Sequence, residues 1–492
     1  MTSGTAAESS KVAANRLVWF AAAAGVALVA ISIFAVNLLP VVTNDSLTYL
    51  DQSRDLMSGG VVEGGYRQVG YPVVLWLDRV VAGILGAEPL LFSVLVQRLL
   101  LVGAIVYSLV LWRWKSLPVM LLILTPEFVV YPDFVLTEGL TVPLSLLLAC
   151  LVSHYFLLDD GATIFRRPER LEIPQIAIFV ALTAVVVVLI MIRFPLAVFG
   201  LIPVAIAWQA VVKRTSASKK ILVVTSGFVA VASMFALAAA IENSREFKVF
   251  SPTTNGVRAE YWGAWRLTFG LHPENQDKAI LASYFDGGTP HPFLARVTDA
   301  NPLYEDQDAE IDAAIVDLLV LSGTSRTRER VFSILGSLRG GRHNDLDVYA
   351  ESVLGSDARS IDESINRNSL AIARGTQAFA DEYNDGVLPQ AVVTSAIFPT
   401  YPSPGVQSLF AYLLPVTWIG LMVLTLKKRR YTMGLIFIVP PLTMALAMGW
   451  LLVDNTRLLM TTSVFAVAGL SGLLEARNLP RSPGKSAGAH EV

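Results

Sequence analysis

The segment NDSLTYLDQSRDLMSGG, residues 44–60, brings acidic, aromatic and basic side chains together directly after an apolar run long enough to cross a membrane. Asp45, Tyr49 and Gln52 are spaced i, i+4 and i+7, which places them on one face of a helix. A carboxylate positioned at a hydroxyl acts as a general base and raises the rate by about 10²–10⁴-fold. The spacing predicts a helix along the membrane surface with Asp45 as candidate base. An interfacial anchor of aromatic and basic residues is the alternative interpretation.

Two further acidic residues and two arginines stand at the ends of apolar runs. Asp133 precedes the run 136–158, and Glu138 lies in its first turn. Arg193 ends another run, and Arg457 opens the last one. Carboxylates can deprotonate an acceptor hydroxyl or hold a metal ion, and an arginine fork pairs with two phosphate oxygens. Alternatively, Glu138 balances a helix dipole and the arginines extend toward lipid headgroups. The combination favours group transfer from a lipid-linked phosphate donor.

The composition places the chain in the membrane class. It has 492 residues, of which 54% are hydrophobic and 16% are charged, whereas soluble domains carry about 25% charged residues. The formal net charge of −2 gives no indication of nucleic-acid binding. The single cysteine, Cys150, allows no intrachain disulfide. The five histidines lack the spacing of a zinc site.

The apolar runs predict a mainly α, polytopic membrane protein with about ten transmembrane helices, because about 20 apolar residues in a helix span the hydrocarbon core. Pro195 separates two of these spans, since proline breaks a helix. The predicted spans are 17–39, 89–112, 117–132, 136–158, 175–193, 195–212, 220–241, 405–426, 432–450 and 456–474.

Basic residues predict the orientation of the spans. With ten spans, the basic clusters that flank them fall on one side, and by the positive-inside rule this side is the cytoplasm. Both termini are then cytoplasmic, and Asp45 faces the extracytoplasmic side of the cytoplasmic membrane. The clusters are Lys11 and Arg16; Arg113 and Lys115; Arg166, Arg167 and Arg170; Lys213, Arg214, Lys219 and Lys220; Lys427, Lys428, Arg429 and Arg430; and Arg477, Arg481 and Lys485.

This topology predicts five regions along the chain. A cytoplasmic tail, 1–16, precedes a transmembrane module, 17–241, whose first outer loop, 40–88, carries surface-lying helices. An extracytoplasmic soluble insert, 242–404, separates spans seven and eight. C-terminal transmembrane helices, 405–474, and a disordered cytoplasmic tail, 475–492, complete the chain.

Five short motifs follow one another in a recognisable order. They are Asp45-Ser46-Leu47-Thr48-Tyr49, Arg67-Gln68-Val69-Gly70-Tyr71-Pro72, Thr137-Glu138-Gly139-Leu140, Arg193-Phe194-Pro195 and Arg457-Leu458-Leu459. Their order and sidedness resemble the GT-C superfamily of membrane glycosyltransferases, in its protein-mannosyltransferase and aminoarabinose-transferase-like branch. The resemblance covers the first six spans and the last one.

The resemblance implies inverting transfer of a sugar from a polyprenyl-phosphate donor to a cell-envelope glycan, lipid or protein, with Asp45 as the base. Ser46 stands where many relatives carry a second acid, so a divalent metal is left open as a cofactor. A lipid-linked sugar transporter or flippase, or a non-catalytic envelope assembly protein, is the alternative. The residues expected at the substrates are Tyr49 and Arg67, which also support the surface helix; Asp133 and Glu138, for acceptor or metal; and Arg193 and Arg457, for phosphate.

Overall fold

The computed structural model describes residues 40–42, 44–57, 70–123, 135, 137–159, 172–212, 218–246, 285–286, 289–290, 392–393, 404–450 and 456–476. Within these residues the chain is almost entirely helical, which confirms the mainly α class, and the strands are two pairs of two residues each. The predicted first span, 17–39, and most of the predicted insert, 242–404, lie outside the described residues.

Four helical segments in the described part are long and apolar enough to cross a membrane: Pro89–Ile123, Thr137–Leu158, Pro174–Ile192 and Phe194–Val212. Two shorter apolar helices, Tyr431–Ala447 and Thr461–Glu475, accompany them. Large apolar side chains also face outward along these helices, Trp208 being 72% exposed. Such an outer surface is stable in lipid and would be costly in water, so the chain is a membrane protein.

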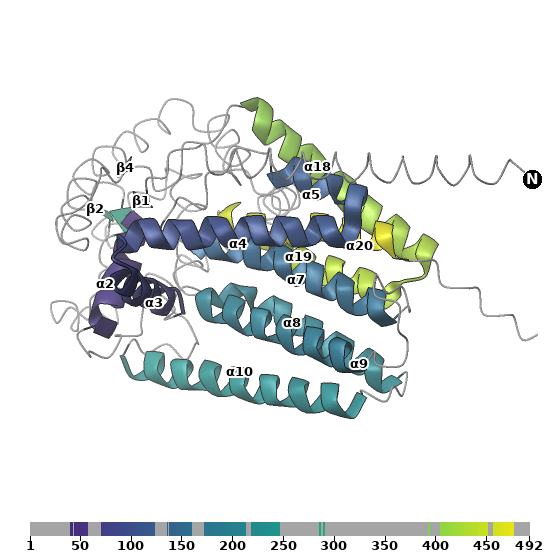
Figure 1. The fold of residues 1–492 in the computed structure, drawn as a ribbon, viewed down its shortest axis with the longest axis horizontal. Helices are drawn as coiled ribbons and strands as arrows, with labels where there is room; N and C mark the ends of the chain where they lie inside the picture. Colours follow the sequence, from purple (N-terminus) through teal and green to yellow (C-terminus); the bar gives the residue numbers. More distant parts are fainter. Residues whose placement is uncertain are drawn as a thin grey trace, which may run out of the picture.

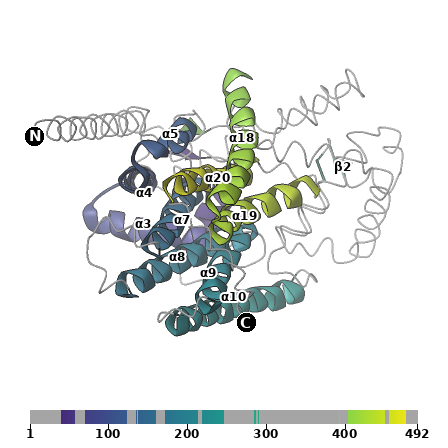
Figure 2. The ribbon, with the colours of Figure 1, turned by 90° about the vertical axis from the view of Figure 1, so that its right-hand side faces the viewer.

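The helices form one bundle, in which α10 and α18 lie at opposite edges (Figures 1 and 2). The elements of its first half are α4 (Pro89–Trp112), η1 (Arg113–Ser116), α5 (Leu117–Ile123), α7 (Thr137–Asp159), α8 (Glu172–Ile192), η4 (Phe194–Gly200), α9 (Leu201–Val212) and α10 (Ser218–Glu246). Those of its second half are α18 (Pro404–Lys428), α19 (Tyr431–Trp450) and α20 (Thr456–Glu475).

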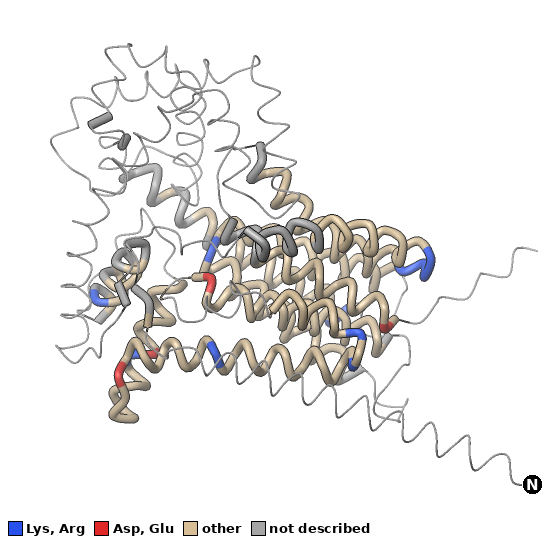
Figure 3. Tube along the Cα trace, turned by 90° about the horizontal axis from the view of Figure 1, so that it is seen from above, with Lys and Arg blue, Asp and Glu red and all other residues tan. Residues whose placement is uncertain are grey.

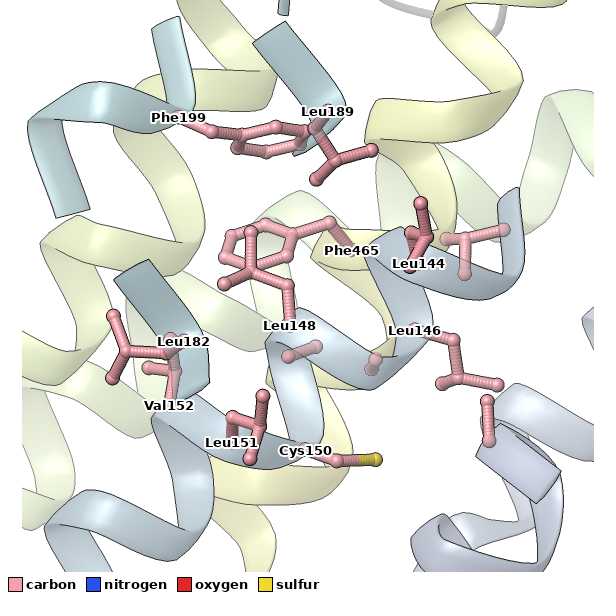
Figure 4. Close-up of a cluster of buried hydrophobic side chains, with 14 of the residues drawn as sticks. Leu144, Leu146, Leu148, Cys150, Leu151, Val152, Leu182, Leu189, Phe199 and Phe465 are labelled. Carbon is pink, nitrogen blue, oxygen red and sulfur yellow. The ribbon is translucent and has the colours of Figure 1, made fainter. Parts of the chain in front are cut away.

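Helix α7 is the centre of the bundle and packs against α4, α8 and α20. Its leucines interlock with Leu182 and Leu189 of α8 and with aromatic rings from η4 and α20 (Figure 4). The ring centroids of Phe199 and Phe465 lie 4.9 Å apart, and those of Phe437 and Phe465 lie 5.1 Å apart. These contacts join segments from both halves of the chain around one apolar core.

Helices α7 and α20 run in the same direction. The hydroxyl oxygens of Thr141 and Thr461 are 3.1 Å apart, and further along both helices a Cβ placed on Gly472 would lie 2.2 Å from the Ser153 hydroxyl oxygen. The pairs are separated by nearly equal lengths of helix, which requires parallel axes. The starts of α7 and α20 therefore lie at the same end of the bundle.

The opposite end of the bundle is held by basic side chains. Lys115 Nζ lies 2.7 Å from Glu475 Oε2, and Lys428 Nζ donates to the carbonyl oxygen of Leu474 at 2.8 Å. Helices α4, α18 and α20 therefore end together, at what we call the Lys115 end, whereas α7 and α20 begin at what we call the Glu138 end. Figure 3 shows that charged residues gather toward the ends of the bundle.

Two further helices, α2 (Asn44–Met57) and α3 (Gly70–Leu85), lie together beside the start of α4 (Figure 1). Helix α2 covers the predicted surface helix, and Tyr49 and Gln52 are both buried, as expected for residues on one face. Helix α3 buries Tyr71, Leu75 and Asp78 but exposes Leu77, Val80, Val81, Ile84 and Leu85.

The described strands form two short pairs. Strand β1 (Val41–Val42), just before α2, pairs in parallel with β4 (Val392–Val393) from the predicted insert. Strands β2 (Phe285–Asp286) and β3 (Thr289–Pro290) form the second pair.

The start of α3 abuts the end of α8 through a glycine. A Cβ placed on Gly70 would lie 2.3 Å from the carbonyl oxygen of Met191 and 2.7 Å from the backbone nitrogen of Ile192. Both atoms belong to backbone and cannot swing away, so only glycine permits this approach. The contact fixes α3 directly beside Arg193.

We predict that Gly70→Ala lowers the stability of the protein by roughly 1–3 kcal/mol, the usual cost of overpacking a close contact. Gly83→Ala is the matched control on the same helix, because a Cβ there meets nothing within 4 Å. It should raise stability by about 0.5–1 kcal/mol through helix propensity. Thermal unfolding in detergent measures both changes. Equal effects of the two substitutions would contradict the close approach.

Candidate functional site

A buried ion pair joins α7 and α8 at the Glu138 end. Arg193 Nη1 donates to Glu138 Oε1, and Thr137 Oγ1 donates to Glu138 Oε2 at 3.2 Å. The Glu138 side chain is 1% exposed and that of Arg193 is 15% exposed. Two charges at this depth are tolerated because they neutralise each other and share hydrogen bonds. The pair is thus a fixed charged centre inside the bundle.

Local structure explains why both side chains reach this position. Glu138 lies in the first turn of α7, where the helix dipole favours a negative charge. Arg193 has extended backbone angles (φ −153°, ψ 104°) between α8 and η4. Its N–H donates to Leu189 O and its carbonyl accepts from Leu196 N–H, both at 2.9 Å. The helix break therefore lies where Pro195 led us to expect it, and it holds Arg193 in place.

A second group of polar side chains connects α2, α3 and α4 beside this ion pair. The rings of Tyr49 and Tyr71 meet edge to face, with centroids 5.0 Å apart and an interplanar angle of 86°. Gln97 Nε2 donates to the Tyr71 hydroxyl at 3.2 Å. Burial raises the pKa of Tyr71 well above its usual value, the bond from Gln97 opposes this shift, and the charges of Asp78 and Glu138 add to it. The phenol therefore keeps its proton at neutral pH.

Asp78 is a buried carboxyl group that our sequence analysis did not select. It lies on α3 with 8% of its surface exposed, and burial raises its pKa from 3.8 to about 6, while a hydrogen bond with Ser93 opposes the shift. Gln97 and Arg98, on α4, are also buried and were also missed. The signal was available: polar residues inside an apolar run are expensive and tend to be functional.

Several of the predicted site residues come together at the Glu138 end. Tyr49 lies at this end because its ring contacts the ring of Tyr71. Glu138 and Arg193 form the ion pair at its centre. The backbone of Arg457 lies in the first turn of α20, one turn before Thr461, and thus level with the start of α7. The backbone of Asp45 lies one turn before Tyr49 on α2. The side chains of Asp45 and Arg457 are outside the described part.

Of the other predicted site residues, two lie outside the described part, and two have a partner that the sequence analysis did not predict. Arg67 and Asp133 lie outside the described residues. Arg193 and Glu138, which we assigned to phosphate and to acceptor or metal respectively, are bonded to each other. The described residues contain no group of three or more His, Cys, Asp or Glu side chains placed to hold a metal ion.

Fold and site together define a helical membrane protein with a buried ion pair and a tyrosine–glutamine cluster at one end of its bundle. Comparisons with family models, with curated proteins and with solved structures find no match.

We predict that breaking the ion pair is costly and that its partners are coupled. Glu138→Gln or Arg193→Leu alone removes the paired partner of a buried charge and should lower the free energy of unfolding by about 3 kcal/mol. The double variant should lose about 0.5–3 kcal/mol less than the sum of the single losses. Chemical denaturation in detergent micelles provides the measurement.

The control is the same double-mutant cycle at a partly exposed ion pair, with Lys115→Met and Glu475→Gln. This pair is expected to couple by at most about 1 kcal/mol. Strict additivity at Glu138 and Arg193 would contradict the pairing.

We also predict a pH dependence that arises from Asp78. Because its folded pKa of about 6 exceeds its usual 3.8, the folded protein holds this proton more tightly than the unfolded chain. Stability from this group is fully present below pH 4 and is lost as the pH rises through 6, by at most about 3 kcal/mol. Asp78→Asn avoids this loss, so its advantage in melting temperature over the wild type should grow between pH 4 and pH 7. A difference that is constant over this range would contradict the assignment.

Proposed function

We propose that the chain is an integral membrane glycosyltransferase that moves a sugar from a polyprenyl-phosphate donor to a cell-envelope acceptor at the extracytoplasmic face. The observation that carries the proposal is the convergence of Tyr49, Glu138 and Arg193 at one end of the bundle. They come from segments far apart in sequence, and each is of a residue type that suits the proposed chemistry. A bilayer-anchored donor presents its phosphate at the depth where such an end meets the headgroups.

The proposed topology has about ten spans and two cytoplasmic termini. It is supported by the Lys115 end, where Arg113, Lys115, Lys427 and Lys428 flank helix ends. The positive-inside rule assigns such an end to the cytoplasm. The Glu138 end then faces the extracytoplasmic side, where the surface helices of the loop 40–88 and the insert 242–404 would meet an envelope glycan, lipid or protein.

In the proposed reaction Asp45 takes the proton of the acceptor hydroxyl as that oxygen bonds to the anomeric carbon of the sugar. The bond between this carbon and the phosphate oxygen breaks, and its electron pair leaves with the polyprenyl phosphate. Arg193 and Arg457 offset the charge that develops on the phosphate. A guanidinium carries five N–H donors, so pairing of Arg193 with Glu138 is compatible with phosphate binding and holds the fork in one orientation.

We predict that Asp45→Asn lowers sugar transfer by about 10²–10⁴-fold, because the amide cannot accept the proton. The measurement is consumption of radiolabelled polyprenyl-phosphate sugars by purified protein in lipid, with envelope extract as acceptor. Asp51→Asn is the control: it makes the same charge change on α2, about 120° around the helix from residue 45, and should leave transfer within a factor of a few.

Two outcomes would count against this function. Full activity of Asp45→Asn in folded protein would remove Asp45 from the mechanism but leave the enzyme class intact. No consumption of any donor by the wild type, with folded protein and acceptor present, would overturn the glycosyltransferase itself.

A further inference from the structure

Tyr71 and Gln97 are buried, and within the described residues their polar atoms have unused hydrogen-bonding capacity. Tyr71 is 0% exposed and Gln97 is 1% exposed. Gln97 Nε2 donates to the Tyr71 hydroxyl, while Gln97 Oε1 has no hydrogen-bond partner within the part of the chain that the structure describes. Gln52 Oε1, on the α2 face that carries Tyr49, is likewise buried without a partner there. Buried polar atoms are rarely left in this state, because each such atom costs about 1–3 kcal/mol.

The pair has unused donors and an unused acceptor among the described residues. With the amide as placed, the Tyr71 O–H and the second N–H of Gln97 Nε2 remain available to donate, and Gln97 Oε1 remains available to accept. With the amide turned over, Tyr71 donates to Gln97 Oε1, and the pair still offers the amide N–H groups and a phenol lone pair. A donor and an acceptor are therefore present in either assignment.

A group that both accepts and donates one hydrogen bond matches this pair, and a hydroxyl is such a group. A phosphate only accepts, so it could use the donors but would leave the acceptor of the pair without a partner. The carboxylates of Asp78 and Glu138 act on Tyr71 from nearby and further disfavour an anion. The pair thus suits the neutral part of a ligand whose phosphate lies elsewhere.

We propose that Tyr71 and Gln97 bind one hydroxyl group of the sugar carried by the lipid-linked donor, and so contribute to sugar specificity. This inference rests on the proposed function and deepens it. It divides the donor between two neighbouring sites: Arg193 and Arg457 for the phosphate, and Tyr71 and Gln97 for a sugar hydroxyl.

The test measures equilibrium binding of two ligands to purified protein in nanodiscs: a polyprenyl-phosphate sugar and the same polyprenyl phosphate without sugar. Gln97→Met should weaken binding of the sugar-bearing lipid roughly 3–10-fold, the usual effect of one lost hydrogen bond. Binding of the bare lipid should not change. Gln209→Met is the matched control, because Gln209 Oε1 is also buried and unpartnered in the described part but lies on α9 toward the other end of the bundle.

A second variant separates binding from folding. Tyr71→Phe with Gln97→Met removes both partners of the internal hydrogen bond, and such paired apolar replacements are close to neutral for stability. The double variant should therefore keep its melting temperature and still bind the sugar-bearing lipid more weakly. A set of deoxy-sugar donors then identifies the group: deleting one particular hydroxyl should weaken wild-type binding and leave binding by the double variant unchanged.

The outcomes distinguish this inference from the proposed function. If the wild type prefers the sugar-bearing lipid and both variants bind it equally well, an internal water fills the pair and this inference is overturned alone. If the wild type binds or consumes no sugar-bearing lipid, both proposals fall.

Discussion

The ion pair between Glu138 and Arg193 is the interaction on which the rest of the structure depends. A single charge in the interior of a membrane bundle is costly, and in this pair each partner offsets the charge of the other. Their pairing ties the start of α7 to the end of α8. Gly70 then sets α3 against the last turn of α8, and the tyrosine contact sets α2 against α3. The element that carries Asp45 is thus positioned, contact by contact, from one buried pair.

The same arrangement gives the molecule two chemically different ends. At the Lys115 end, lysines pair with Glu475 and with the last carbonyls of α20, so the charges there close helix ends near the surface of the bundle. At the Glu138 end, charged and polar groups are enclosed and bonded to one another across helices. Exposed ion pairs contribute little to stability, whereas buried charges must be paired and hydrogen-bonded to offset the cost of removing them from water. This asymmetry is why the Glu138 end is the place to look for chemistry.

Local features of the chain were predictable from the sequence. Apolar length predicted the helical membrane class, Pro195 predicted the helix break, and the spacing of Tyr49 and Gln52 predicted a helix that carries both on one face. Contacts between segments far apart in the chain were not predictable from the sequence. Glu138 and Arg193 each had a plausible separate partner, and nothing local indicates that they meet. Gln97 and Asp78 looked like isolated polar residues in apolar surroundings, because their role depends on how α3 packs on α4. The roles of all the predicted site residues stay predictions: Asp45, Tyr49, Arg67, Asp133, Glu138, Arg193 and Arg457.

The central claim is that the Glu138 end receives a lipid-linked phosphate donor. Its most direct test is photo-crosslinking with a polyprenyl-phosphate probe that carries a diazirine on the isoprene unit next to the phosphate, followed by mapping of the labelled peptides by mass spectrometry. Our account predicts labelling in α3, at the start of α7 and at the end of α8, all reduced by excess unlabelled polyprenyl phosphate. Competed labelling confined to the Lys115 end, in η1 or in the last turn of α20, would contradict it.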